Sequence, residues 1–344
     1  MDCHVARFTP RNDNYAIRVI LPMNIHSIET FGTHEGPGIR FVIFAQGCNY
    51  KCLYCHNPDS QAIKVKSKKQ KGEREQLITK IKNSIPYFGK NGGVTVSGGE
   101  PLLQADEILE LFKELKSLGI HTALDTNGSI LNNSIKELLR YTDLVLLDIK
   151  HINPLWHDIV TQKAKSKGQN SGVTLNSFQD PNTALIPAST NLPVIPVKAG
   201  IRKIEEQIIN SNQNGSPDTT LKSTAGPEDD NNNGTIEQSS NNDCVPAIEF
   251  LNYLESINKP VWIRYVLVPG YTDQKKYLEE TAQVVGRFKN LDRIEILPYH
   301  TLGVDKYEKL GWKYPLEGIK PPTEEEIAKA KKILEKSDKT VLVR

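Results

Sequence analysis

Residues 39–57 read IRFVIFAQGCNYKCLYCHN, so an apolar run leads directly into three cysteines. The β-branched and aromatic residues of the run predict a strand that ends in a cysteine loop. Cys48, Cys52 and Cys55 have the spacing CxxxCxxC and supply three thiolates, whereas a closed metal site needs four ligands. On a [4Fe-4S] cluster, three cysteines leave one iron open to a small molecule. The spacing therefore favours chemistry over electron storage.

Two other interpretations of the cysteines are weaker. A zinc ion could take His56 as a fourth ligand, but adjacent Cys55 and His56 cannot easily wrap one tetrahedral ion. A disulfide framework would need denser cysteines than five in 344 residues, of which Cys3 and Cys244 are far from the loop. Reduced thiols are therefore expected, and they indicate a cytoplasmic protein.

Strand-like and helix-like segments alternate outward from the loop, which predicts an α/β fold with a parallel sheet curled into a full or partial barrel. The predicted strands cover residues 39–47, 93–101, 121–128, 143–150, 261–270, 293–300 and 340–344. The predicted helices cover residues 73–85, 105–119, 133–140, 247–257, 278–288 and 324–336.

Unusual polar residues stand at the carboxyl ends of these strands, where parallel barrels assemble active sites. They are Asp125, Asp148, Lys150, Arg264 and His300. The alternative is that each is an unrelated polar residue at a strand end. Asp148 and Lys150 alternate with Ile149, so both should point to one face of the sheet, either toward a ligand or as a buried ion pair.

Composition excludes several classes of partner. The 43 basic and 41 acidic residues give a net charge of +2, without the basic surface of a nucleic-acid or membrane-binding protein. No apolar run approaches the ~20 residues of a membrane span, and the first 18 residues lack the apolar core of a secretory signal. A soluble, unexported protein is expected.

Two segments differ from the rest of the chain. Residues 161–243 are rich in Asn, Ser, Gly and Thr, and they predict a largely disordered insertion that leaves the barrel on its active face. Residues 1–22 precede the organised sequence and are predicted to be a non-essential extension. The barrel would then be built from residues 23–160 and 244–344.

The chain resembles the radical S-adenosylmethionine (SAM) enzymes, and among them the pyruvate formate-lyase-activating enzymes. The runs that carry the resemblance are HEGPGIRFVIFAQGCNYKCLYCHNPD, SGGEPLLQ, HTALDTNG, LVLLDIKH, VWIRYVLVPGYTD and IEILPYHTLGVDKYEKLGWKYPLEG. The resemblance implies a partial (β/α)6-type TIM barrel that uses a [4Fe-4S] cluster and SAM.

The resemblance also implies roles for single residues. Cys48, Cys52 and Cys55 would hold the cluster, whose fourth iron would bind the amino and carboxylate groups of SAM. Tyr54 would lie beside the adenine or simply pack under the loop, and His56 would touch the cofactor or cap the loop. The remaining SAM contacts would come from Gly98, Gly99, Glu100, Asp148, Ile149, Lys150, Arg264 and His300, and Asp125 with Asp148 would hold a monovalent cation.

The implied reaction is the reductive cleavage of SAM to a 5′-deoxyadenosyl radical that abstracts a glycine hydrogen from pyruvate formate-lyase, in anaerobic glucose metabolism. Flavodoxin or ferredoxin would be the reductant, the protein a monomer, and residues 299–318 a docking surface for the protein substrate.

Three different functions would also fit parts of this pattern. The first is an activase of another glycyl radical enzyme, such as glycerol dehydratase or ribonucleotide reductase. Many of those activases carry a ferredoxin-like cysteine domain, but this chain has no cysteine between Cys55 and Cys244. The second is an electron-transfer or regulatory protein, and the third is an impaired copy of the activase that binds only a cluster.

Overall fold

The computed structural model describes residues 23–63, 73–162 and 245–344, all of which belong to one compact unit. The predicted extension at residues 1–22 lies outside these ranges. So does the predicted insertion at 161–243, apart from its first two residues. Both domain predictions therefore stay untested.

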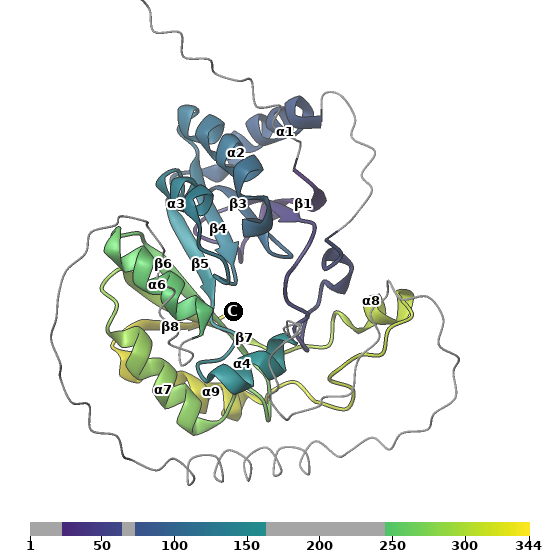
Figure 1. Cartoon of the computed structure of the whole chain (residues 1–344), viewed down its shortest axis with the longest axis vertical. Helices are drawn as coiled ribbons and strands as arrows, with labels where there is room; N and C mark the ends of the chain where they lie inside the picture. Colours follow the sequence, from purple (N-terminus) through teal and green to yellow (C-terminus); the bar gives the residue numbers. More distant parts are fainter. Residues whose placement is uncertain (1–22, 64–72, 163–244) are drawn as a thin grey trace, which may run out of the picture. The chain divides into compact units, whose positions relative to one another are not determined.

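One sheet of eight strands organises the described residues, and its strands lie side by side in chain order (Figure 1). The strands are β1 (Ile25–Gly32), β2 (Arg40–Ala45), β3 (Gly93–Gly98), β4 (His121–Thr126), β5 (Leu144–Asp148), β6 (Val261–Leu267), β7 (Leu291–Pro298) and β8 (Thr340–Val343). β1 is antiparallel to β2, and each later strand is parallel to the one before it. β1 and β8 each pair with one described strand, so the sheet is open between them and the predicted α/β partial barrel is confirmed.

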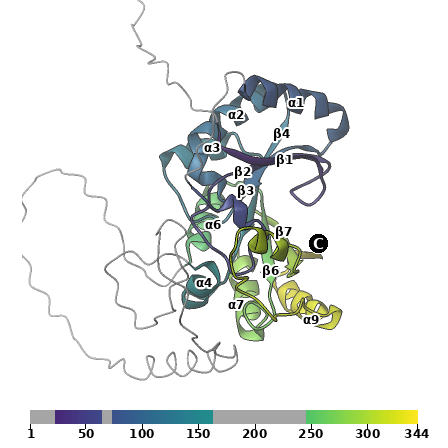
Figure 2. The same ribbon diagram turned by 90° about the vertical axis from the view of Figure 1, so that its right-hand side faces the viewer.

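Helices connect the parallel strands and pack on the sheet (Figure 2). They are α1 (Glu73–Phe88), α2 (Ala105–Ser117), α3 (Asn133–Arg140), α4 (Pro154–Thr161), α6 (Pro246–Ser256), α7 (Lys275–Gly286), α8 (Val304–Lys309) and α9 (Glu324–Leu334). Short 3-10 helices occupy Pro58–Ser60 (η1), Pro101–Gln104 (η2) and Glu335–Ser337 (η3). Helix α2 contacts β4, α6 contacts β5, and α9 contacts β7 and β8. No helix in the described ranges is long and apolar enough to cross a bilayer.

Every strand and helix predicted from the sequence is present, and β1, α4 and α8 are not in the prediction, nor are the 3-10 helices η1 and η2. β1 is a largely exposed edge strand without a clear alternation, and α8 has six residues, too few for a helical period. α4 did carry a signal, because the side chain of Asn153 caps it and Pro154 occupies its first turn.

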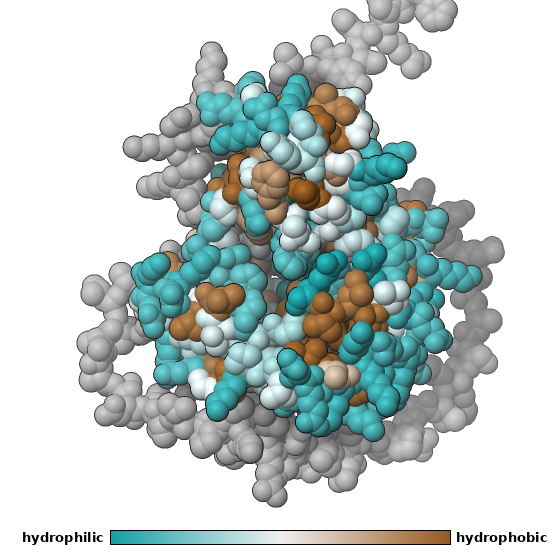
Figure 3. Space-filling view, turned by 180° about the vertical axis from the view of Figure 1, so that it is seen from behind, coloured by the Kyte–Doolittle hydropathy of each residue, from teal (hydrophilic) through white to brown (hydrophobic). Residues whose placement is uncertain are grey.

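Two hydrophobic cores hold the site in place. The main core packs between the sheet and the helices and includes Phe41, Val96 and Phe112. The second core lies under the cysteine loop and joins that loop to α4, to the end of β6 and to the residues after β7. Its buried members are Leu53, Tyr54, Val160, Val268, Tyr299 and Leu316. On the face shown in Figure 3, hydrophobic residues also gather in patches among hydrophilic ones.

Candidate active site

The three cysteines lie in the loop that follows β2, at the carboxyl edge of the parallel strands. None of them is in a disulfide, and each is half-buried. The Cys48 N–H donates to the carbonyl of Gln61 (3.1 Å), and the Cys55 N–H donates to the carbonyl of Cys52 (3.0 Å). Backbone hydrogen bonds thus fix the course of the loop, and the Sγ of Cys48 also accepts from the Tyr50 N–H (3.4 Å).

The end of α4 fixes the other side of the loop. The N–H groups of Lys51 and Leu53 donate to the carbonyls of Thr161 and Val160, both at 2.9 Å. These carbonyls belong to the last turn of α4, where they have no partner within the helix. The helix that runs into the predicted insertion is therefore part of the support of the cysteine loop, which the sequence did not indicate.

The donor set fits an iron–sulfur cluster. Burial raises the pKa of the Cys52 thiol to about 12, so the loop alone keeps this thiol neutral, and a bound cationic metal would favour the thiolate. The described residues contain no group of three or more His, Cys, Asp and Glu side chains placed around a single ion. A cubane cluster does not need such a group, because each thiolate binds a different iron.

Gly98 and Gly99 allow the end of β3 to pack against the cysteine loop. Gly98 has φ +118°, and a Cβ there would lie 2.3 Å from the nitrogen of Ala45. A Cβ on Gly99 would lie 2.1 Å from the carbonyl oxygen of Gly47. Close backbone contact therefore requires both glycines, and their predicted role as a pocket for the methionyl amine stays a prediction.

Glu100 ties two turns together with its carboxylate. One oxygen accepts from the Leu102 N–H (3.0 Å) and the Thr126 hydroxyl (2.6 Å), and the other accepts from the Asn127 N–H (2.8 Å). The side chain is fully buried, and this burial raises its pKa to about 7. The carboxylate of Glu100 thus connects the turn at residues 98–101 to the turn at residues 125–128. Its contact with SAM stays a prediction.

Asp125 and Arg264 form a buried ion pair between β4 and β6. The Oδ2 of Asp125 accepts from Nη1 of Arg264 (2.9 Å) and from the hydroxyl of Ser97 (2.6 Å). Burial lowers the pKa of Arg264, but the neighbouring carboxylates, Asp125 first, raise it above its ordinary value. The Oδ1 of Asp125 is buried and has no hydrogen-bond partner among the described residues, so it is able to accept from a ligand or a cation.

Asp148 and Lys150 also form an ion pair, with 2.7 Å between Oδ2 and Nζ, while Ile149 between them is buried. The ion pair that the sequence left open as an alternative is thus present. The ammonium of Lys150 lies 5.8 Å from the centroid of the Tyr54 ring. Tyr54 packs in the second core, which agrees with its predicted packing under the loop. The SAM contacts of these four residues stay predictions.

His300 and His56 meet at the rim of the site. Their ring centroids are 5.3 Å apart, and both side chains are exposed. His300 follows β7, whereas His56 belongs to the cysteine loop, so the two are neighbours only in the folded chain. All of the predicted site residues lie on strands of the sheet or on the loops that follow them.

Sequence analysis missed two carboxylates near Arg264. Glu295 is fully buried, accepts from Arg344 at 2.8 Å, and has an oxygen 3.8 Å from Nε of Arg264. The sequence did contain a signal for Glu295, because it is a charged residue inside the largely apolar run RIEILP at residues 293–298. Glu35 is half-buried, and burial raises its pKa while the charge of Arg264 opposes that shift.

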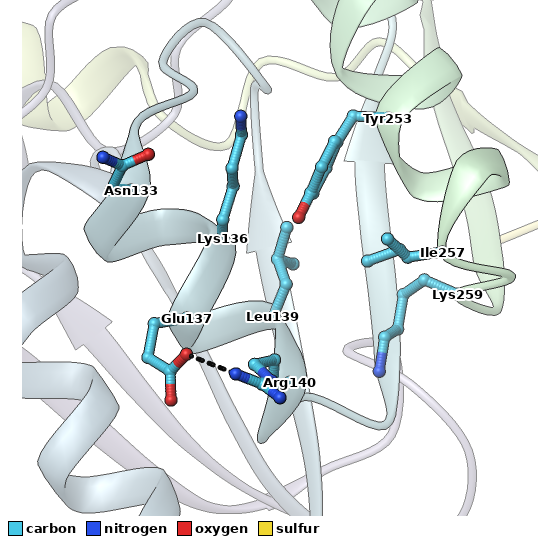
Figure 4. Close-up of a pocket in the computed structure, with 8 residues that line it drawn as sticks. All are labelled: Asn133, Lys136, Glu137, Leu139, Arg140, Tyr253, Ile257 and Lys259. Atoms are coloured by element: carbon cyan, nitrogen blue, oxygen red, sulfur yellow. Dashed lines mark hydrogen bonds and ion pairs between the residues drawn. The ribbon is translucent and has the colours of Figure 1, made fainter.

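A groove of about 460 Å³ between α3 and α6 lies away from this site (Figure 4). Its charges already have partners: Arg140 binds Glu137 at 3.1 Å, and the ammonium of Lys136 lies 5.2 Å from the Tyr253 ring centroid. Lys259 donates to a backbone carbonyl at 2.5 Å and precedes β6, at the amino ends of the strands. Lys259 therefore lies at the edge of the sheet opposite the cysteine loop.

Comparison with known proteins agrees with the geometry. Residues 34–170 match the family described as "4Fe-4S single cluster domain". A pyruvate formate-lyase-activating enzyme of Streptococcus mutans is 36% identical over 318 residues, which cover 90% of this chain and 90% of that protein. One of Staphylococcus epidermidis is 34% identical over 322 residues, which cover 90% of this chain and 94% of that protein. The solved structure of Streptococcus suis SuiB bound to precursor peptide SuiA has a TM-score of 0.50 at 13% identity, over 92% of this chain and 50% of that chain, and shows the fold alone.

An open, mostly parallel α/β sheet with a three-cysteine loop at its carboxyl edge defines a radical SAM enzyme. The predicted [4Fe-4S] cluster and SAM are the cofactors of that class, and the cluster-family match agrees with them. The extent and identity of the sequence matches go further: the chain belongs to the pyruvate formate-lyase-activating enzyme family.

Proposed function

We propose that the protein activates pyruvate formate-lyase by removing one hydrogen atom from a backbone glycine, which leaves a glycyl radical on that protein. The names of the relatives support this substrate. The observation that carries the proposal is the loop of Cys48, Cys52 and Cys55, which offers three free thiols on a backbone held from both sides. The described ranges contain no fourth cysteine, so the loop leaves a site on a cluster for SAM.

When bound, the cluster would supply the electron that cleaves SAM to methionine and a 5′-deoxyadenosyl radical, which takes the glycine hydrogen. The chain itself orients the reactants. Burial raises the pKa of the Cys52 thiol, and the positive charge of Lys150 opposes part of that rise. The free Oδ1 of Asp125 offers a buried acceptor for a ligand, and Glu100 holds the turn next to Asp125.

The remaining assignments are part of the same proposal. The SAM contacts are those predicted above, and a monovalent cation at Asp125 and Asp148 would compete with Lys150 for the Asp148 carboxylate. Flavodoxin or ferredoxin is the proposed reductant, and a monomer the proposed state. Residues 1–22 are the proposed dispensable extension.

Anaerobic reconstitution with iron and sulfide, followed by reduction in the presence of SAM, tests the proposal. We expect 5′-deoxyadenosine, and a glycyl radical signal by electron paramagnetic resonance when pyruvate formate-lyase is present. The absence of 5′-deoxyadenosine would leave a protein that binds a cluster only.

Other glycyl radical enzymes provide the control for the substrate. A radical on glycerol dehydratase or ribonucleotide reductase, with none on pyruvate formate-lyase, would reject the partner but keep the chemistry. The lack of any cysteine between Cys55 and Cys244 favours pyruvate formate-lyase, because the added cluster domain of many other activases is missing from that stretch.

A further inference from the structure

We propose that Glu295 is a positioning residue, which holds the guanidinium of Arg264 in the orientation in which Arg264 binds SAM. This inference rests on the proposed function, in which Arg264 contacts SAM, and it adds a role for a residue outside the predicted site. Glu295 belongs to β7 and Arg264 to β6, and the two are direct partners in the register of these parallel strands. Their side chains therefore leave the sheet side by side, on the same face.

Each nitrogen of the Arg264 side chain faces a different partner. Nη1 donates to Oδ2 of Asp125 at 2.9 Å, and Nη2 donates to the carbonyl of His34, also at 2.9 Å. Nε lies 3.8 Å from Oε2 of Glu295. Both Nε and Oε2 are buried, and neither has a hydrogen-bond partner among the described residues. A buried donor and a buried acceptor in this situation are expected to serve one another, after a small shift or through one water molecule.

The other oxygen of Glu295 already has a partner. Oε1 accepts from Nε and Nη2 of Arg344, at 3.0 and 2.8 Å. Arg293, two residues earlier on β7, instead stacks on Trp262, with 3.9 Å between its guanidinium carbon and the ring centroid. In the described part of the chain, the ion pairs of Glu295 are therefore with Arg344 through Oε1 and with Arg264 through Oε2.

Burial makes the contact between Glu295 and Arg264 strong. The side chain of Glu295 is 0% exposed and that of Arg264 is 10% exposed, so little water screens the two charges. The side chain of Arg344 is 26% exposed, and solvent screens its charge more. Without the Glu295 carboxylate, the guanidinium of Arg264 would be held only at its two Nη atoms. It would then be able to tilt about the line that joins its contacts with Asp125 and His34.

The direction of the guanidinium decides what Arg264 can bind. An arginine carries five N–H donors in a planar fork. Asp125 and His34 each accept from one Nη atom, and the N–H of Nε faces Glu295, so each Nη keeps a second N–H for a ligand. Binding of a ligand carboxylate by such a fork depends on its direction. Glu295 should therefore affect the affinity for SAM more than the steps that follow binding.

Glu295→Gln is the direct test, because glutamine has the shape of glutamate without its charge. Equilibrium dialysis measures SAM binding to the reconstituted protein, and 5′-deoxyadenosine formation is measured against SAM concentration. We expect Kd and KM for SAM to rise roughly tenfold, whereas the rate at saturating SAM should change by less than about twofold. Bound iron should equal that of the unaltered protein, since Glu295 lies on β7 and not in the cysteine loop.

Arg344→Gln is the matched control, because it breaks the same ion pair from the other side and leaves Oε2 of Glu295 facing Arg264. Its Kd for SAM should stay within about twofold of the unaltered value. The double variant Glu295→Gln with Arg344→Gln removes one charge of each sign, and so guards against misfolding caused by an unbalanced buried charge. It should show the same rise in Kd, of roughly tenfold, as Glu295→Gln alone.

Unchanged SAM affinity in both variants that lack Glu295 would overturn the positioning role and leave Glu295 as a structural partner of Arg344. An equal loss of affinity in Arg344→Gln and Glu295→Gln would also overturn it, because the ion pair would then matter and not the contact with Arg264. The proposed function is tested separately. If the variants differ in SAM affinity as expected, but the unaltered protein forms no radical on pyruvate formate-lyase, the proposed function fails and the positioning role holds.

Discussion

Glu100 is the residue on which the two turns beside the cysteine loop depend. Burial raises its pKa to about 7 from 4.5, so between these pH values the folded protein binds more protons than the unfolded chain. The contribution of Glu100 to the unfolding free energy therefore falls as pH rises through this window, by roughly 1–3 kcal/mol. Glu100→Gln cannot ionise and should lose that slope in urea unfolding at about pH 5 and about pH 7.5.

Glu249→Gln is the matched control, because Glu249 is an exposed carboxylate on α6. This control should keep the pH dependence of the unaltered protein. A slope that survives Glu100→Gln would show that another group causes it.

The cysteines allow a second comparison between single residues. Cys52→Ser should reduce bound iron and abolish 5′-deoxyadenosine, because the hydroxyl is a poor substitute for a thiolate ligand. Cys244→Ser should retain both, since the motif does not include that cysteine. Iron analysis of the reconstituted proteins measures the difference, and equal iron in the two variants would contradict the ligand assignment.

Helix α4 accepts hydrogen bonds from the cysteine loop, so a substitution that destabilises α4 should also weaken the binding of the cluster. Val160→Ala removes atoms from a fully buried side chain in the second core and should cost about 1–3 kcal/mol of stability. The carbonyl of Val160 also accepts from the Leu53 N–H in the loop, at 2.9 Å. We therefore expect faster loss of iron to a chelator from this variant.

Val285→Ala provides the comparison for α4, because Val285 is equally buried but belongs to α7 and the main core. Thermal unfolding should show a similar loss of stability in both variants. Equal rates of iron loss would mean that α4 has no special link to the loop.

Across the molecule, the stretch between α4 and α6 lies in sequence between β5 and β6. These two strands are direct neighbours in the sheet, so the sheet does not need the stretch to connect its two parts. A protein in which Gln162 is joined to Cys244 should fold and activate its substrate at least as well as the full chain. Loop-closure free energy grows only with the logarithm of loop length, so we expect the unfolding free energy to change by less than about 2 kcal/mol. Urea unfolding and the activation assay measure the two quantities, and lost activity with intact folding would give the segment a role.

Much of this protein follows from local patterns in the sequence. Apolar runs and helical periods predicted the α/β order, because burial on a sheet or a helix face imposes a short-range period. CxxxCxxC directly after a strand indicated the cluster, since three thiolates within eight residues can meet without any distant contact. Besides η1 and η2, three elements were missed for different reasons: β1 is largely exposed, α8 is short, and α4 was marked only by its cap.

Tertiary structure alone decided how the site residues are used. The Arg264–Asp125 ion pair joins residues 139 positions apart, and Glu100 accepts from Asn127 in another turn. Gly98 and Gly99 are glycines because neighbouring backbone lies where their side chains would be. Such contacts depend on which strands become neighbours in the sheet. Packing of the whole chain determines that arrangement, and no local pattern encodes it.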